Sequence, residues 1–108
     1  MITYKDFKRI FYAYDGEPEC EIYFNGTTTT YMIIKYDDNV TFQRCGVENG
    51  SGEFEYPDLD TLYHSVVIDG ICLEKDWNNI ETIVIDSSFD LAFPEEIEKL
   101  KEWYELDI

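Results

Sequence analysis

The sequence predicts a single α+β domain over residues 1–108, with a mainly antiparallel sheet of about four strands and helices on one face. Three observations lead to this prediction. The 108-residue length suits one domain. Apolar and polar residues alternate over 20–45, as in half-buried antiparallel strands. Segments with helical periodicity stand near both ends of the chain, so that they can cover one side of a sheet.

The first helix is expected over residues 3–14. Thr3 can cap its N-terminus, because Asp6 follows three residues later in a pattern close to a capping box. Asp15 and Gly16 then end the helix. The apolar positions recur at helical spacing and form one face: Phe7, Ile10, Phe11 and Tyr14.

Residues 20–45 are expected to form an antiparallel meander. Asn25 and Gly26 form the first turn signal, and residues 37–39 form the second. The middle of the segment is apolar on both faces at residues 31–34, which suits a central strand. Three strands are expected, at residues 20–24, 27–36 and 40–44.

The second half predicts a short edge strand at 53–56 and then a helix. Pro57 fits the first position of that helix. A buried strand is expected at 82–86, and residues 87–93 form a connection. Pro94 opens a last helix, with acids in its first turn and lysines later, as the helix dipole favours.

Residues 66–73 allow two interpretations. Asp69 and Gly70 stand between β-branched residues, which is a hairpin signal. Gly70 can equally separate two helices, the second with Leu73, Trp77 and Ile80 on its apolar face. We favour a helix, a short extended segment, a turn and a short helix.

The chain is strongly acidic and yet rich in aromatic residues. It carries 24 Asp and Glu against 8 Lys and Arg, a formal charge of −16, and 17% of its residues are aromatic. An acidic disordered segment would have few aromatics, so the composition indicates a folded domain. Between Cys45 and Glu98, Lys75 alone opposes fourteen acids. They are Glu48, Glu53, Glu55, Asp58, Asp60, Asp69, Glu74, Asp76, Glu81, Asp86, Asp90, Glu95, Glu96 and Glu98.

No motif points to catalysis, a metal or a cofactor. The single histidine, His64, has no assignable nucleophile and is expected to be a surface or half-buried imidazole near a helix end. Asp58 and Asp60 begin like a calcium loop, but the central glycine and the final glutamate of such a loop are missing. Phosphate-binding glycine motifs are absent from the sequence. We therefore expect no enzyme and no cofactor.

The cysteines and the pattern of apolar residues indicate the cellular compartment. Three cysteines, Cys20, Cys45 and Cys72, are odd in number and widely spaced, so they are expected to be small buried hydrophobes rather than disulfides. No apolar stretch approaches 18 residues, and the N-terminus lacks the apolar region of a signal peptide. We expect a cytoplasmic protein, monomeric because the charge opposes pairing between edge strands.

Charge also selects among partners. Direct nucleic-acid binding is disfavoured, because phosphates would meet a field of like sign. A basic protein partner is favoured, since charge complementarity accelerates encounter. Seven acids expected in loops or first helical turns are the candidate partner-binding residues: Glu48, Glu53, Glu55, Asp58, Asp60, Glu74 and Asp76.

By size, charge and composition the chain resembles two groups of small, acidic α+β proteins. One is the phage-encoded inhibitors of host nucleases, the anti-CRISPR and anti-restriction proteins, many of which mimic nucleic acid. The other is the bacterial immunity proteins that neutralise a cognate toxin. The first resemblance implies a non-enzymatic inhibitor docked in the nucleic-acid groove of a nuclease. An immunity protein is the first alternative, and a small metal-binding or enzymatic domain is the second.

Overall fold

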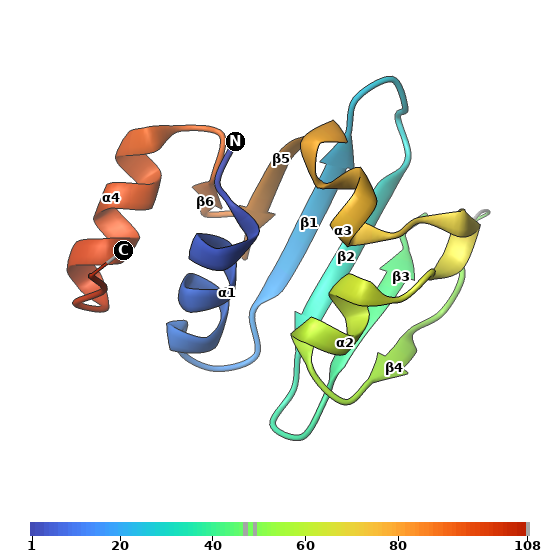
Figure 1. Ribbon diagram of the computed structural model, residues 1–108, viewed down its shortest axis with the longest axis horizontal. Helices are drawn as coiled ribbons and strands as arrows, with labels where there is room; N and C mark the ends of the chain where they lie inside the picture. The colour runs from blue at the N-terminus through green and yellow to red at the C-terminus, as the bar shows by residue number, and fades with distance from the viewer. Residues whose placement is uncertain (47, 49, 108) are drawn as a thin grey trace.

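The computed structural model describes residues 1–46, 48 and 50–107. Its centre is a six-stranded sheet in which every neighbouring pair is antiparallel, in the order β4-β3-β2-β1-β5-β6. Figure 1 shows β1 and β2 in the middle of this sheet. The strands are β1 (Glu19–Phe24), β2 (Thr30–Lys35), β3 (Val40–Arg44), β4 (Phe54–Tyr56), β5 (Ile80–Ile85) and β6 (Phe89–Asp90).

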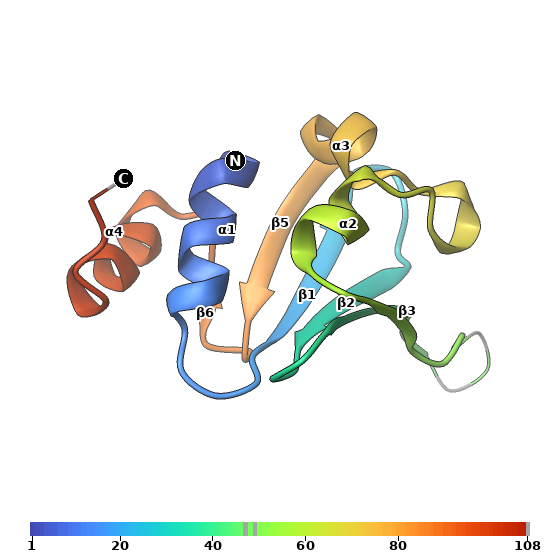
Figure 2. The same cartoon turned by 60° about the horizontal axis from the view of Figure 1, so that its bottom comes forward.

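The helices lie on one side of the sheet. Figure 2 shows α1, α2 and α3 above it, with the opposite face left uncovered. Helix α4 lies beside α1 at the β6 edge (Figures 1 and 2). The helices are α1 (Tyr4–Ala13), α2 (Leu59–His64), α3 (Leu73–Asp76) and α4 (Pro94–Trp103), with 3-10 turns η1 (Ile68–Gly70) and η2 (Trp77–Asn79).

The period-two pattern of the strands builds the core. In β1, Cys20, Ile22 and Phe24 face the helices and are buried, and Ile33 in β2 pairs beside Cys20. From the other side, Phe7, Ile10 and Phe11 of the face predicted for the first helix are fully buried, whereas Tyr14 is the C-cap and is half-buried. These side chains fill one continuous apolar layer between sheet and helices.

An aromatic group closes the top of this core. Trp77 is buried, and its ring meets Tyr4 and Tyr63 edge to face, with centroids 5.4 and 5.9 Å away. Tyr4 and Tyr63 themselves stack at 3.5 Å. The indole N–H donates to the Ile2 carbonyl oxygen at 3.0 Å. These contacts join α1 to α2 and η2, which lie far from it in the sequence.

Most predicted elements are confirmed, and three points are corrected. The sheet has six strands rather than about four: the expected edge strand at 53–56 forms as β4, and β6 extends the opposite edge. Strand β6 lies within the segment predicted as a connection. It has only two residues, which is too few for an alternating pattern, and it is defined by the pairing of Asp90 with Val84. Pro57 lies before the helix rather than at its first position. Asp58 is the N-cap, since its carboxylate accepts from the Thr61 amide at 2.7 Å.

Residues 66–73 combine features of both interpretations. Val66 and Cys72 form an isolated antiparallel bridge, η1 makes the turn between them, and α3 follows directly. The favoured order of helix, extended segment, turn and short helix is therefore confirmed. Asp69 occupies the left-handed region at φ 61°, which a tight turn requires.

Within the residues that the structure describes, every helix is too short or too polar to cross a bilayer.

Candidate partner-binding site: an acidic pole

Three connections place their acids at one end of the molecule. They are the α1–β1 loop, the β2–β3 turn and the segment that leads through β4 into α2, which meet at the bottom of Figure 1. The acidic residues that these three connections place at this end are all exposed. We call this set the acidic pole: Asp15, Glu17, Asp37, Asp38, Glu53, Glu55 and Asp58.

The acidic pole surrounds two hollows that share the β2–β3 turn. The helix-side hollow, of about 490 Å³, lies between this turn and the end of α1 and includes Asp15, Lys35 and Asp58 in its wall. The sheet-side hollow, of about 480 Å³, lies where β3 and β4 meet the turn. Its wall consists of Glu17, Tyr36, Asp37, Asp38, Asn39, Thr41, Glu53 and Glu55.

One cation lies at the margin of the acidic pole. Lys35 donates from Nζ to the Tyr14 carbonyl oxygen at 2.6 Å, and its ammonium lies 5.9 Å from the centre of the Phe11 ring. Burial lowers the pKa of Lys35, although Asp15 and Asp37 oppose this effect. Lys35 therefore supports the end of α1, while the described wall of the sheet-side hollow contains no Lys, Arg or His.

The hydroxyl of Tyr36 is influenced by the negative charges around the sheet-side hollow. Its hydroxyl donates to Glu53 Oε1 at 2.8 Å. This hydrogen bond raises the pKa of Tyr36, and burial and the nearby charges of Glu53, Glu17 and Glu19 add to the effect. Acids from the α1–β1 loop and from the residue just before β4 thus act on one phenol, because these segments line the same hollow.

Two residues in the wall of this hollow each carry a buried acceptor without a partner among the described residues. Thr41 is only 2% exposed, and its Oγ1 forms no hydrogen bond with the described residues. The buried Oδ1 of Asn39 is likewise without a donor. Buried polar groups are normally satisfied, so these two atoms are unusual features of the wall.

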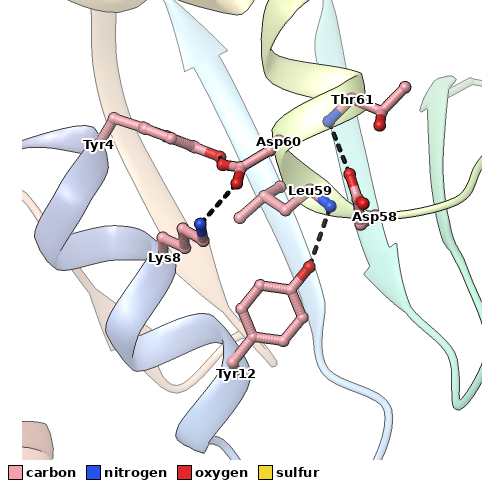
Figure 3. A network of polar contacts seen from close by, with 7 residues as sticks. All are labelled: Tyr4, Lys8, Tyr12, Asp58, Leu59, Asp60 and Thr61. Atoms are coloured by element: carbon pink, nitrogen blue, oxygen red, sulfur yellow. Dashed lines mark hydrogen bonds and ion pairs between the residues drawn. The ribbon is translucent and has the colours of Figure 1, made fainter.

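The α2 acids predicted as binding residues have internal contacts. Figure 3 shows Asp58 capping α2 and Asp60 pointing toward α1. Asp60 accepts from the Tyr4 hydroxyl and from Lys8 Nζ, both at 2.6 Å. These hydrogen bonds lower the pKa of Asp60, with that to Lys8 the largest cause. Asp60 therefore fastens α2 to α1.

The acids of α3 are also engaged. Glu74 Oε2 lies 3.0 Å from His64 Nδ1, and Asp76 accepts from the Cys72 amide at 3.0 Å. Asp69, just before α3, accepts from the Tyr31 hydroxyl and from Arg44, each at 2.7 Å. Glu74 and Asp69 therefore join neighbouring elements, whereas Asp76 accepts from the N-cap of its own helix.

The remaining predicted binding residues lie on the sheet side. Glu48 lines a third hollow, on the uncovered face, together with Glu21, Met32 and Cys45. Glu53 and Glu55 line the sheet-side hollow. The structure thus brings Glu53, Glu55 and Asp58 into the acidic pole and places Glu48, Asp60, Glu74 and Asp76 elsewhere; their roles in binding stay predictions.

Four pole residues were not among the predicted binding residues: Asp15, Glu17, Asp37 and Asp38. Asp15 and the pair Asp37 and Asp38 were interpreted only as turn residues, and all four precede the strongly acidic half of the chain. The signal in the sequence was that the two connections beside the expected strands carried these four acids. Their convergence depends on strand pairing and could not be read locally.

The described side chains offer little for nucleophilic chemistry. His64 is exposed at the end of α2, as predicted. Burial raises the pKa of the Cys20 and Cys45 thiols, which disfavours the reactive thiolate. Cys20 and Cys72 are buried, as expected, whereas Cys45 is half-buried.

A metal centre does not form among the described residues, since no group of three or more His, Cys, Asp or Glu is arranged to hold an ion. The acids of the pole are thus spread around hollows rather than gathered on one point.

No family model matches the chain, and the searches of curated proteins and of solved structures found no significant match.

Proposed function

We propose that this protein is a non-catalytic inhibitor that docks its acidic pole in the basic nucleic-acid groove of a nuclease, of the CRISPR-effector or restriction type. The observation that carries the proposal is the acidic pole itself. Three connecting segments, the last of which includes β4, carry seven acidic residues that are exposed. Lys35 alone opposes them in the described walls of the two hollows. Such a surface attracts a basic partner and accelerates encounter with it.

The overall charge density supports mimicry of nucleic acid. The longest dimension is 38 Å, and the net charge is −16, which amounts to one net negative charge per about 2.4 Å. Duplex DNA carries one charge per ~1.7 Å, and one helical turn is about 34–36 Å long. The protein therefore approaches the length and the charge of one duplex turn.

The chemistry of the site favours binding over catalysis. The pole offers carboxylates on an open surface, without a histidine or a cysteine in the described walls of its two hollows. Catalysis by carboxylates needs two groups held in different environments. An immunity protein, which neutralises a cognate toxin, would use the same surface on a different nuclease.

Affinity capture with matched variants tests the proposal. The pole variant carries Asp37→Asn, Asp38→Asn, Glu53→Gln and Glu55→Gln. The control variant carries Glu81→Gln, Glu95→Gln, Glu102→Gln and Asp107→Asn, exposed positions outside the acidic pole with the same change in charge. Each bait is incubated with bacterial lysate at low salt, washed with about 0.5 M salt, where charge screening is strong, and the eluates are identified by mass spectrometry.

We expect the wild type and the control variant to retain one nuclease that salt releases, and the pole variant to lose it. The captured nuclease is then purified, and duplex DNA should displace the protein from it in a competition assay. Equal capture by the pole variant, or simultaneous binding of DNA and protein, would contradict the proposal. If the captured nuclease is a toxin, the immunity alternative is supported.

A further inference from the structure

The sheet-side hollow differs from the rest of the acidic surface. Its described wall contains five carboxylates, of Glu17, Asp37, Asp38, Glu53 and Glu55, without a positive side chain. Acids alone would not define a site, because exposed carboxylates are well solvated. The second, independent observation is the unpartnered hydroxyl of Thr41, a residue that is 98% buried.

The side chain of Thr41 faces this hollow. Its strand neighbours Val40 and Phe42 are buried on the helix side, so strand alternation places Thr41 on the opposite face. Thr41 pairs with Glu55 across β3 and β4, and paired residues share a face. Glu55 and Thr41 both line the hollow, and the Asn39 Oδ1 acceptor lies on the same wall.

The wall thus presents mainly hydrogen-bond acceptors, so a suitable ligand is one that supplies hydrogen-bond donors. Ionised carboxylates and an amide oxygen only accept hydrogen bonds, and the Tyr36 hydroxyl already donates to Glu53. A bare metal ion fits poorly, because the described acids form no cluster of metal-ligand geometry. An ammonium group presents a compact point charge, whereas a guanidinium presents five N–H donors in a rigid plane.

We infer that the sheet-side hollow binds the guanidinium group of an arginine, with the carboxylates neutralising its charge and Thr41 Oγ1 and Asn39 Oδ1 accepting from its N–H groups. The inference rests on the proposed function only for the source of this arginine, which is the basic partner. Arginine is enriched among the residues that dominate binding energy at protein interfaces. The hollow would then fix the orientation of a complex that diffuse charge alone brings together.

A single substitution tests the inference. Thr41→Val keeps the shape of the side chain and removes the hydroxyl. Because the hydroxyl has no partner, we expect the variant to melt at the same temperature as the wild type or higher. The matched control is Thr82→Val, on the same face of the sheet, where Thr82 donates to Asp90 and the substitution should lower the melting temperature.

The probes are three capped tripeptides, acetyl-Gly-X-Gly-amide, in which X is arginine, lysine or citrulline. Citrulline has nearly the shape of arginine without its charge. Binding is followed by two-dimensional 15N–1H NMR titration of wild type, Thr41→Val and Thr82→Val at low salt. The readout is which backbone amides shift and at what peptide concentration the shifts reach half their maximum.

We expect the arginine peptide to bind saturably with shifts centred on Asn39, Thr41 and Glu55. Its affinity should exceed that of the lysine peptide by several-fold, as expected for forked hydrogen bonding, and the citrulline peptide should not saturate. In Thr41→Val this preference should fall toward equality, while Thr82→Val keeps it.

Equal titration by the arginine and lysine peptides, shifts spread over the whole acidic surface, or an undiminished preference in Thr41→Val would each overturn the inference. A lower melting temperature of Thr41→Val would do so too, since the hydroxyl would then have a partner. None of these results depends on capture of a nuclease, so failure of the arginine site and failure of the proposed function can be told apart.

Discussion

The acidic pole and the α2–α3 region (residues 59–76) look alike in sequence and differ in structure. Both carry closely spaced acids beside aromatic residues. In the α2–α3 region, Asp60, Asp69 and Glu74 each contact a base within 3.0 Å. At the pole, the described residues form no hydrogen bond or ion pair to the carboxylates of Asp37, Asp38 or Glu55.

This contrast separates two uses of negative charge. A carboxylate that accepts from a neighbouring helix contributes to the fold, and its charge is partly neutralised there. A carboxylate that only faces solvent adds to the self-repulsion of the compact state and offers its charge to a partner. Counting acids along the chain therefore does not locate a binding surface, and the following predictions test the distinction.

The largest expected effect is a loss of stability when the aromatic packing beside the α2–α3 region is disturbed. Trp77→Phe shrinks a buried ring and leaves the Ile2 carbonyl oxygen without its donor. We expect the free energy of unfolding to fall by about 2 kcal/mol, measured by urea denaturation. Binding of the arginine peptide at the pole should persist in the folded variant, because Trp77 contacts the opposite end of α1. Loss of that binding would contradict the view that the acidic pole and the α2–α3 region are independent.

A pair of charge-matched substitutions sharpens the comparison directly. Asp60→Asn weakens the contacts with Tyr4 and Lys8, both side chains of the ion pair being 40–49% exposed. We expect a loss of about 1 kcal/mol, the scale of one charged hydrogen bond in a solvent-screened pair. Asp38→Asn makes the same change in charge at the pole and should leave stability unchanged or slightly higher. Equal losses in the two variants would refute the distinction.

The pH dependence should separate the same two groups. Contacts with hydrogen-bond donors lower the pKa of Asp60 and Asp69 in the α2–α3 region. The Thr61 amide has the same effect on Asp58, a pole acid that also caps α2. A carboxyl with a lowered folded-state pKa stabilises the protein above its ordinary pKa of about 4 and loses this contribution as the pH falls through the folded-state value. Stability should therefore drop below about pH 4, measured as the urea midpoint. Asp60→Asn should show a shallower drop, and an identical slope would contradict the assignment.

Salt should produce the smallest change. Screening weakens repulsion between exposed carboxylates, so raising the salt concentration to about 0.5 M should increase the melting temperature of the wild type by a few degrees. The pole variant carries four fewer negative charges and should gain less. The comparison requires both proteins at one pH and one protein concentration. An equal gain would mean that pole charges do not repel one another appreciably.

Local patterns determined most of the elements. The period of 3.6 residues in the first helix and the alternation in β1 to β3 were readable because each pattern reports which face meets the core. The proline at the start of α4 was informative for a similar reason, since its fixed φ suits a first helical turn. The acidic composition predicts a basic partner, and this stays a prediction.

The tertiary structure decided the edges of the sheet and the candidate site. Strand β6 is too short to carry a pattern and exists through its pairing with β5. Pro57 resembled a helix start, but the Asp58 side chain supplied the cap one residue later. The acidic pole depends on strand order, which brings residues 15–17, 37–38 and 53–58 to one end of the molecule. Sequence determines what each side chain can do, whereas chain topology determines which side chains meet, because contacts between distant segments follow from packing the whole core at once.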